Sequence, residues 1–232
     1  MGNVIEFRNI TKYFPGVKAL DDISFTANGG EVLALMGENG AGKSTLLKVL
    51  NGDYQQTSGE YLVNGEPCHF NSPREAVAAG IGVIYQERQI MLELTVGENI
   101  FLGRLPTGFM GRIKMREVHS RAQAIIDEFG LDMKSTDKVK DLSVAYQQMV
   151  EIMKAYSREN LKMIAFDEPT ASLSDSEIDS LFRIIRKLKA EGKVIIYVSH
   201  RMAEIRQIAD RVAIFKDCLL YTSPSPRDRS VS

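Results

Sequence analysis

The hydrophobic positions follow two different patterns along the chain. VIEFRNI (4–10) and ALDDISF (19–25) alternate apolar and polar residues, as half-buried antiparallel strands do. Later apolar runs are almost unbroken, which is typical of buried parallel strands. These runs are EVLALM (31–36), IGVIY (81–85), LKMIAF (161–166), KVIIYV (193–198) and RVAIF (211–215). The chain is therefore predicted to contain both an antiparallel and a parallel sheet.

Helical patterns separate the predicted strands. One helix begins at a capping box, Ser72-Pro73-Arg74-Glu75. The second and third have apolar faces at helical spacing. These faces are Val118, Ala122, Ile125, Ile126 and Phe129 in the second helix, and Leu181, Ile184, Ile185 and Leu188 in the third. The alternation predicts an α/β fold, and the mostly helical span of about 88–158 is expected to be an inserted subdomain.

Composition narrows the class of protein. The 232 residues are 44% hydrophobic and 25% charged, which predicts an ordinary globular domain with a full core. The net charge of −1 disfavours a nucleic-acid partner. No apolar run approaches the roughly 20 residues of a membrane span, and no signal-peptide pattern opens the chain. These features predict a cytosolic protein.

A phosphate-binding loop follows the run at 31–36. Gly37 and Gly42 precede Lys43-Ser44 in the pattern G-x-x-x-x-G-K-S, between a strand and a helix. Lys43 is expected to reach the β- and γ-phosphates, and Ser44 to bind Mg²⁺. The predicted ATP contacts are Gly37, Glu38, Asn39, Gly40, Ala41, Gly42, Lys43, Ser44 and Thr45.

Two adjacent acids, Asp167 and Glu168, end the strand at 161–166. Because successive strand residues point in opposite directions, the two carboxylates are expected to have different roles. Asp167 is predicted to hold Mg²⁺ and Glu168 to act as general base toward the attacking water. The alternative is a pair of solvated acids at a strand end.

Three further residues are candidates for the same site. Gln86 follows a strand, and its amide is expected to bridge the metal or water and a partner protein. An ordinary polar strand end is the alternative for Gln86. His200 follows the strand at 193–198 and is predicted to contact the γ-phosphate. Phe14 is a candidate for stacking on adenine, with core packing as its alternative.

With these residues in place, the chain resembles the ATP-binding subunit of ABC transporters over about residues 3–217. The phrases SHR and QQMVEI make it similar to the bacterial monosaccharide importers of the ribose, galactose and xylose type. The matching phrases are FPGVKAL (14–20), GENGAGKSTLLKVLNG (37–52), GIGVIYQE (80–87), LTVGENIFLGR (94–104), LSVAYQQMVEI (142–152), DEPTASLSD (167–175) and YVSHRM (197–202). The resemblance implies a P-loop NTPase fold over residues 1–217, with a RecA-like core, an antiparallel β subdomain and a helical subdomain.

The same resemblance implies a catalytic set and a set of partners. Lys43, Gln86, Glu168 and His200 would form the catalytic set, and Ser44, Gln86 and Asp167 would hold Mg²⁺. Two such domains form a head-to-tail sandwich with ATP between them, so Ser143 and Asp175 would contact the partner domain's nucleotide. A membrane permease and an extracytoplasmic sugar-binding protein are the other expected partners. The expected location is the cytoplasmic face of the bacterial membrane, as a peripheral subunit that powers monosaccharide import.

The family's LSGGQ phrase is altered in this chain. It reads Leu142-Ser143-Val144-Ala145-Tyr146, with a β-branched side chain where a glycine lets the backbone approach phosphate. The chain is therefore expected to be a poor partner for a second copy of itself. It resembles the first half of a fused pair of unequal nucleotide-binding domains, whose second half would complete the ATP site.

The last residues depart from the family pattern. Residues 218–232 match what translation of an adapter used in transposase-made sequencing libraries would produce, as far as Asp228. We expect this tail to be non-native, without regular structure and without function. A divergent native Pro/Ser-rich tail is the alternative.

Other functions remain as alternatives. One is a soluble ABC ATPase that acts on nucleic acid or the ribosome, and another is an ABC motor for a different substrate. The first is disfavoured by the net charge and by the absence of a long insertion between the phosphate loop and the LSGGQ-like phrase.

Overall fold

The structure, a computed structural model, describes residues 2–171, 173–216 and 219–223. Within the described chain two units are distinguished. Unit 1 comprises 1–84, 160–169 and 185–232, and unit 2 comprises 85–159 and 170–184. The predicted helical segment of about 88–158 lies inside unit 2. None of the helices in the described residues has the length and apolar character that a membrane span requires.

Unit 1 contains the predicted antiparallel sheet. Its strands are β1 (Val4–Phe14), β2 (Val17–Asn28), β4 (Ser58–Val63) and β5 (Glu66–Cys68), in the order β2-β1-β4-β5. The apolar positions of the alternating pattern face inward, and Phe7 stacks on Phe25 with ring centroids 4.3 Å apart. This confirms the expectation of an antiparallel β subdomain.

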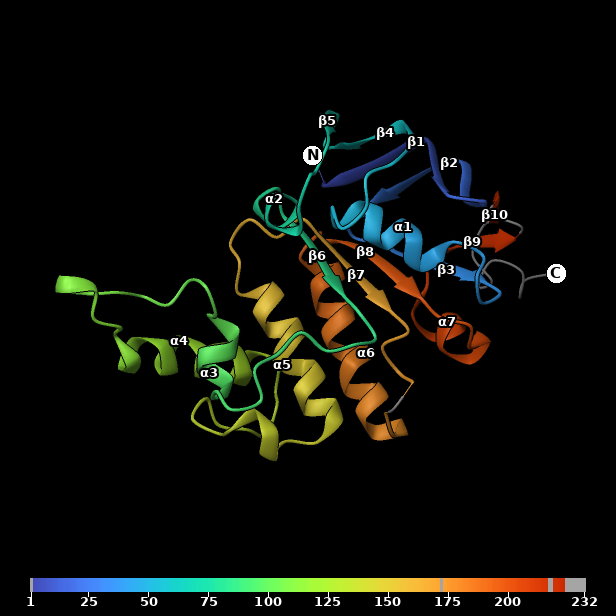
Figure 1. The fold of residues 1–232 in the computed structure, drawn as a ribbon. Helices are drawn as coiled ribbons and strands as arrows, with labels where there is room; N and C mark the ends of the chain where they lie inside the picture. The colour runs from blue at the N-terminus through green and yellow to red at the C-terminus, as the bar shows by residue number, and fades with distance from the viewer. Residues whose placement is uncertain (1, 172, 217–218, 224–232) are drawn as a thin grey trace. The chain divides into compact units, whose positions relative to one another are not determined.

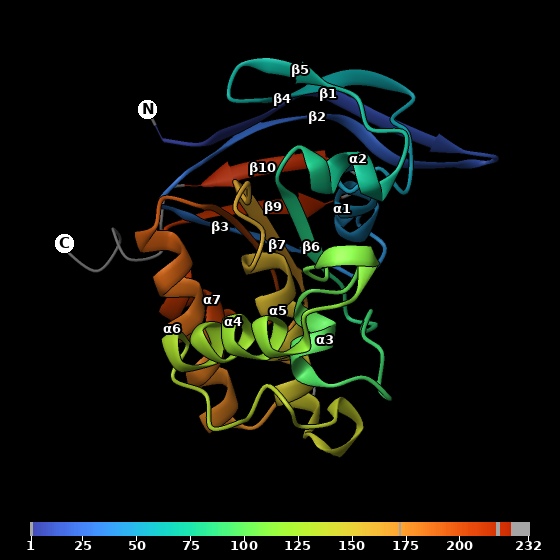
Figure 2. The same ribbon diagram turned by 90° about the vertical axis from the view of Figure 1, so that its left-hand side faces the viewer.

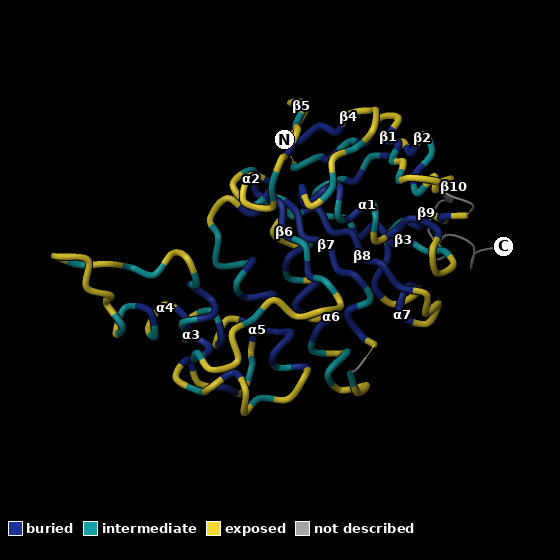
Figure 3. Tube along the Cα trace, viewed as in Figure 1, coloured by how far each residue is buried: buried dark blue, intermediate teal, exposed yellow. Residues whose placement is uncertain are grey.

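The second sheet of unit 1 has the order β10-β9-β3-β8-β7-β6. Its strands are β3 (Val32–Gly37), β6 (Ile81–Ile84), β7 (Met163–Asp167), β8 (Val194–Val198), β9 (Arg211–Lys216) and β10 (Leu219–Ser223). All pairings except β9 with β10 are parallel. Every residue of β7 and β8 is buried, as the unbroken apolar runs predict (Figure 3).

Helices cover both faces of this sheet. Helix α1 (Lys43–Leu50) contacts β3 and β7 on one side and β2 of the antiparallel sheet on the other. Helix α7 (Met202–Ile208) lies on the opposite face, where Ile205 packs against Ala34 (Figure 1). Figure 2 shows α1 between the two sheets from a second direction, and α2 (Pro73–Ala78) contacts β6. The parallel strands and their covering helices confirm the predicted α/β class.

Strand β10 differs from the sequence prediction. Residues 219–223 were expected to lack regular structure, but they pair antiparallel with β9, from Leu219 opposite Lys216 to Ser223 opposite Val212. A sheet edge offers free backbone donors and acceptors, and backbone pairing depends little on side-chain identity. The expectation is therefore wrong for these five residues. The remaining tail positions, 218 and 224–232, lie outside the described residues.

Unit 2 is built mainly from helices. They are α3 (Val96–Ile100), α4 (Met115–Glu128), α5 (Val144–Tyr156), the first part of α6 (Asp175–Ala190), and two 3₁₀ turns at Phe109–Gly111 and Val139–Asp141. Helix α3 begins at a capping box between Thr95 and Glu98 and contacts both α4 and α5. Val118, Ala122 and Ile126 are buried, so the predicted apolar face of α4 is its packing face.

Candidate functional site

The phosphate-binding loop connects β3 to α1 in unit 1. Its shape depends on glycine at two positions, Gly37 (φ +152°) and Gly42 (φ +104°). A Cβ at Gly42 would overlap the carbonyl oxygen of Ala19, and one at Gly37 would overlap that of Phe215. The glycines predicted from the motif are therefore required by close backbone approach as well as by conformation.

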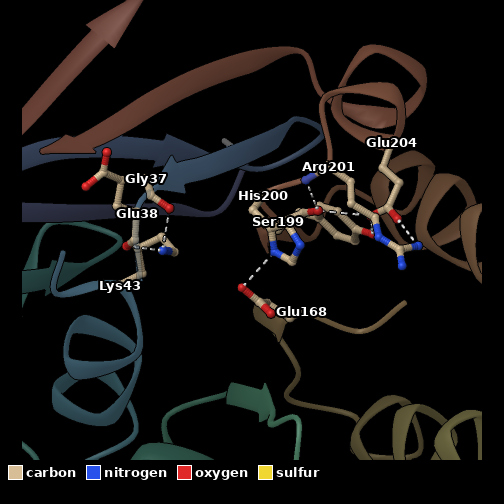
Figure 4. Close-up of polar contacts among 9 residues, drawn as sticks. Gly37, Glu38, Lys43, Glu168, Ser199, His200, Arg201 and Glu204 are labelled. Atoms are coloured by element: carbon tan, nitrogen blue, oxygen red, sulfur yellow. Dashed lines mark hydrogen bonds and ion pairs between the residues drawn. The ribbon is translucent and has the colours of Figure 1, made fainter. Parts of the chain in front are cut away.

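Lys43 lies inside this loop. It is 6% exposed, and its Nζ donates hydrogen bonds to the carbonyl oxygens of Gly37 at 2.8 Å and Glu38 at 2.9 Å (Figure 4). Burial lowers the pKa of Lys43, while the carboxylates of Glu168 and Asp167 act in the opposite direction. The first turn of α1 thus holds an amine beside the loop's backbone N–H groups, where an anion is stabilised.

A pocket of about 380 Å³ opens on the same loop. It is lined by Gly37, Glu38, Asn39, Gly40 and Ala41 and by Ile214, Phe215 and Lys216 of β9. Five of the predicted nucleotide contacts therefore share one cavity. The β9 residues in its wall were not predicted, because they are about 175 positions away in the sequence.

Asp167 and Ser44, two of the three residues predicted to hold Mg²⁺, lie close together. Asp167 ends β7 and is 9% exposed, and its carboxylate lies close to the Ser44 side chain. Burial raises the pKa of Asp167, and the interaction with Ser44 partly opposes that shift. A hydroxyl and a carboxylate oxygen are ligands that suit Mg²⁺. Among the described residues no group of three His, Cys, Asp or Glu side chains could hold a metal ion. Ser44 and Asp167 therefore fit an ion that keeps water and phosphate oxygens as its other ligands.

Glu168 and His200 form a pair across the tips of neighbouring strands. The Oε1 atom of Glu168 lies 3.2 Å from Nδ1 of His200 (Figure 4). Glu168 has φ +47°, a left-handed conformation that costs a non-glycine residue roughly 1–2 kcal/mol. Its backbone N–H donates to the carbonyl of Val198 at 3.0 Å, which holds this conformation against β8. The predicted base and the predicted phosphate contact are therefore direct neighbours.

A second network, not predicted from the sequence, supports His200. Glu204 on α7 is 5% exposed and accepts hydrogen bonds from the hydroxyls of Tyr197 and Ser199, each at 3.0 Å. Arg201 donates from Nη1 to the other oxygen of Glu204 at 3.2 Å and from its backbone N–H to Ser199 Oγ at 3.0 Å. The chain on both sides of His200 is thus attached to one buried carboxylate. The local sequence gave no signal for Glu204, because an acid in a short helix is ordinarily a solvated side chain.

Phe14 ends β1 and is half-buried. Its ring packs edge-on against Tyr54 with centroids 5.2 Å apart, and Lys12 Nζ lies 4.9 Å from its centroid. These contacts support the packing alternative. Stacking of Phe14 on adenine stays a prediction.

Three predicted site residues belong to unit 2. Gln86 is exposed just after β6, and Asp175 is exposed at the first position of α6. Ser143 caps α5, because its Oγ accepts a hydrogen bond from Tyr146 N–H at 3.3 Å. Val144, the next residue, is 38% exposed. The roles of Gln86, Ser143 and Asp175 toward nucleotide stay predictions.

The family profile described as "ABC transporter" matches residues 20–171 of the chain. The chain belongs to the ABC transporter family. The match includes the phosphate loop, Gln86, the altered LSGGQ phrase and the acid pair, and it stops before His200.

Solved ABC proteins have the same fold. A nucleotide-free ATP-binding cassette from an ABC transporter superposes with a TM-score of 0.83 at 26% identity, covering 97% of this chain and 93% of the other. A cassette in its ADP conformation gives a TM-score of 0.83 at 26% identity, with coverage of 98% and 93%. The predicted nucleotide-binding fold of the family is therefore confirmed.

The similar curated proteins are named as arabinose import ATP-binding proteins. An arabinose import ATP-binding protein from Yersinia pestis is 52% identical over 213 residues, covering 92% of this chain and 40% of that protein. Its counterpart from Vibrio parahaemolyticus is 53% identical, with coverage of 92% and 42%. The chain thus spans about two fifths of the length of these relatives.

Proposed function

We propose that this chain is a nucleotide-binding domain that hydrolyses ATP with Mg²⁺ to drive import of a monosaccharide through a membrane permease. One observation carries the proposal: Lys43 is held inside a phosphate loop in the same unit as the Glu168–His200 pair. The names of the relatives support the direction of transport and make arabinose the first candidate sugar.

Binding begins at the loop. The backbone N–H groups of residues 38–42 and the N-terminus of α1 attract the β-phosphate. Lys43 exchanges its hydrogen bonds with the Gly37 and Glu38 carbonyls for phosphate oxygens. Burial has already removed much of the water around the amine, so its attraction to phosphate is stronger than it would be at the surface.

Ser44 and Asp167 are the residues that would hold Mg²⁺. The ion, when bound, neutralises negative charge on the phosphate oxygens. Before binding, the burial of Asp167 penalises its charged carboxylate. Binding of a cation therefore relieves the cost of ionising Asp167.

Hydrolysis uses the tips of β7 and β8. Glu168 accepts the proton of a water that attacks the γ-phosphate, and the bond to the ADP oxygen breaks as the new P–O bond forms. His200 holds the Glu168 carboxylate from the other side and lies near the departing phosphate. The Glu204 network keeps His200 in place for this step.

A second, unequal nucleotide-binding domain is required for full activity. Ser143 and Asp175 of this chain serve the partner's nucleotide, but Val144 obstructs close approach to phosphate. Gln86 and the helical subdomain transmit closure to the permease, and an extracytoplasmic protein delivers the sugar. The protein accordingly works as a peripheral subunit at the cytoplasmic face of the bacterial membrane.

Glu168→Gln tests the catalytic assignment. Affinity for a fluorescent ATP analogue is expected to stay within about twofold, and turnover with the second domain supplied to fall by at least about 100-fold. Glu66→Gln, on the exposed strand β5, is the matched control and leaves both quantities unchanged. Turnover that survives in Glu168→Gln removes Glu168 as the base.

Lys43→Ala tests the loop itself. Loss of the buried amine is expected to abolish measurable ATP binding by the isolated chain. Tight residual binding contradicts the assignment of the phosphate site.

Stimulation of ATP turnover by RNA or DNA, with no response to a reconstituted permease, favours the soluble-ATPase alternative instead.

A further inference from the structure

The chain between α3 and α4 forms an ordered hairpin in unit 2, which we call the 105–114 hairpin. Two backbone hydrogen bonds and one β-bridge join its arms. They are Gly108 N–H to Arg112 O at 2.7 Å, Lys114 N–H to Pro106 O at 2.9 Å, and the bridge between Thr107 and Ile113. The tip, Phe109–Gly111, is a 3₁₀ turn. The backbone hydrogen bonds therefore fix the conformation of the tip residues.

Large apolar side chains are exposed at this tip and on the adjoining arm. Phe109 is 89% exposed, Met110 is 86% exposed and Ile113 is 47% exposed. In Figure 3 the tip is the yellow end of the segment that precedes α4. Met110 also has φ +58°, which a non-glycine residue adopts at a cost. Exposed apolar side chains gathered at one point mark a surface for a partner or a membrane.

The charges within the hairpin itself have one sign, and the first acid beyond it, Glu117, lies 3.5 Å from Lys114 Nζ. No Asp or Glu occurs between Glu98 and Glu117, although the whole chain has a net charge of −1. Arg112, Lys114 and Arg116 in this interval are exposed. An apolar tip with basic flanks is complementary to a lipid surface that carries negative charge.

We infer that the 105–114 hairpin binds an anionic lipid surface, with Phe109 and Met110 entering the interfacial layer and Arg112 and Lys114 contacting the headgroups. The inference rests on the proposed function for the location beside a membrane. Two apolar side chains and a few charges give weak, reversible attachment. The hairpin therefore supplements the permease as a docking contact and helps to orient the domain.

Vesicle sedimentation tests this inference on the full 232-residue chain. Vesicles of phosphatidylcholine with 30% phosphatidylglycerol are compared with pure phosphatidylcholine. The bound fraction is expected to be at least about fivefold higher on the anionic vesicles and to fall as salt screens the charges. The double variant Phe109→Ser/Met110→Ser is expected to lower binding at least about threefold.

Matched control variants separate vesicle binding by the hairpin from nonspecific adsorption of the protein to lipid. Met91 and Leu92 are 54% and 49% exposed elsewhere in unit 2, so Met91→Ser/Leu92→Ser is expected to leave vesicle binding unchanged. The contribution of the basic residues is tested in the same way. Arg112→Gln is expected to lower binding to the anionic vesicles, whereas Lys134→Gln, at another exposed site of unit 2, is expected to leave it unchanged. Circular dichroism verifies that every variant is folded.

Three results overturn the inference: equal binding to both vesicle types, equal binding by wild type and the Phe109/Met110 variant, or binding only when permease protein is present in the vesicles. ATP-analogue binding is measured on the same samples. Normal ATP binding that is lost in Lys43→Ala, together with absent lipid binding, overturns the hairpin assignment alone. Absent ATP binding in wild type contradicts the proposed function.

Discussion

Replacing Glu204 with alanine removes a carboxylate that is 5% exposed and accepts hydrogen bonds from Tyr197, Ser199 and Arg201. Tyr197 and Ser199 are themselves 0% and 2% exposed, so water does not readily replace the lost acceptor. Hydrogen bonds to a charged group contribute about 1.5–3 kcal/mol each. Loss of the hydrogen bonds from the two buried hydroxyls is therefore expected to lower the free energy of unfolding by about 3–6 kcal/mol.

Urea denaturation followed by circular dichroism measures that loss. Glu204→Gln keeps the side-chain shape and one acceptor oxygen, so it is expected to cost only about 1–2 kcal/mol. Met202→Ala is the matched control on the same helix, because Met202 is 45% exposed. Its effect is expected to stay within about 0.5 kcal/mol.

The same variants test whether Glu204 positions His200. With the second domain supplied, Glu204→Ala is expected to lower kcat about tenfold or more while ATP affinity changes less than about threefold. Glu204→Gln is expected to recover much of the loss. If Glu204→Ala unfolds within 1 kcal/mol of wild type and keeps its kcat, the network neither stabilises the fold nor positions the histidine.

Three further predictions concern the loop, the metal side and the LSGGQ-like phrase. Gly42→Ala places a Cβ against the carbonyl oxygen of Ala19 and is expected to weaken ATP binding at least about tenfold. In Gly40→Ala the added Cβ meets open space, so this variant is expected to lose roughly 1–2 kcal/mol of stability through its backbone conformation and to weaken ATP binding less than Gly42→Ala does. Titration calorimetry with ATP compares the affinities of the two variants. Burial raises the pKa of Asp167, so the folded state loses stability as pH rises from 3.8 through that raised pKa. Asp167→Asn is accordingly expected to raise the Tm of the nucleotide-free protein at pH 7. This gain in Tm over the wild type is expected to disappear as the pH falls toward 3.8. A gain in Tm that does not change with pH contradicts the prediction. Val144→Gly is expected to increase ATP turnover by the isolated chain, and no change argues against steric obstruction.

Several local features of the site were predictable from the sequence. The phosphate loop needs glycine for its conformation and a strand and a helix on either side, and all of these are encoded within about 20 consecutive residues. Asp167 and His200 could be placed at strand ends because unbroken apolar runs precede them. These predictions depend on turn chemistry and hydrophobic pattern, which act over short distances.

Other features depend on which strands become neighbours. Glu168 and His200 are 32 positions apart and meet because β7 pairs with β8, Asp167 opposite Val198. Nothing in the local sequence distinguished Glu204, since its burial follows from the packing of α7 on the sheet. The strand at 219–223 was missed for a similar reason, because it forms where β9 offers an open edge.

The sequence by itself thus determined the family, the α/β class, the phosphate loop and the residues that are expected to act on ATP. Tertiary structure decided the pairing of Glu168 with His200, the burial of the Glu204 carboxylate that holds the chain around His200, and the exposure of the apolar residues of the 105–114 hairpin. The physical reason is the same in each case. Hydrophobic periodicity and glycine conformation specify elements locally, whereas long-range strand pairing and burial specify which side chains share a hydrogen bond.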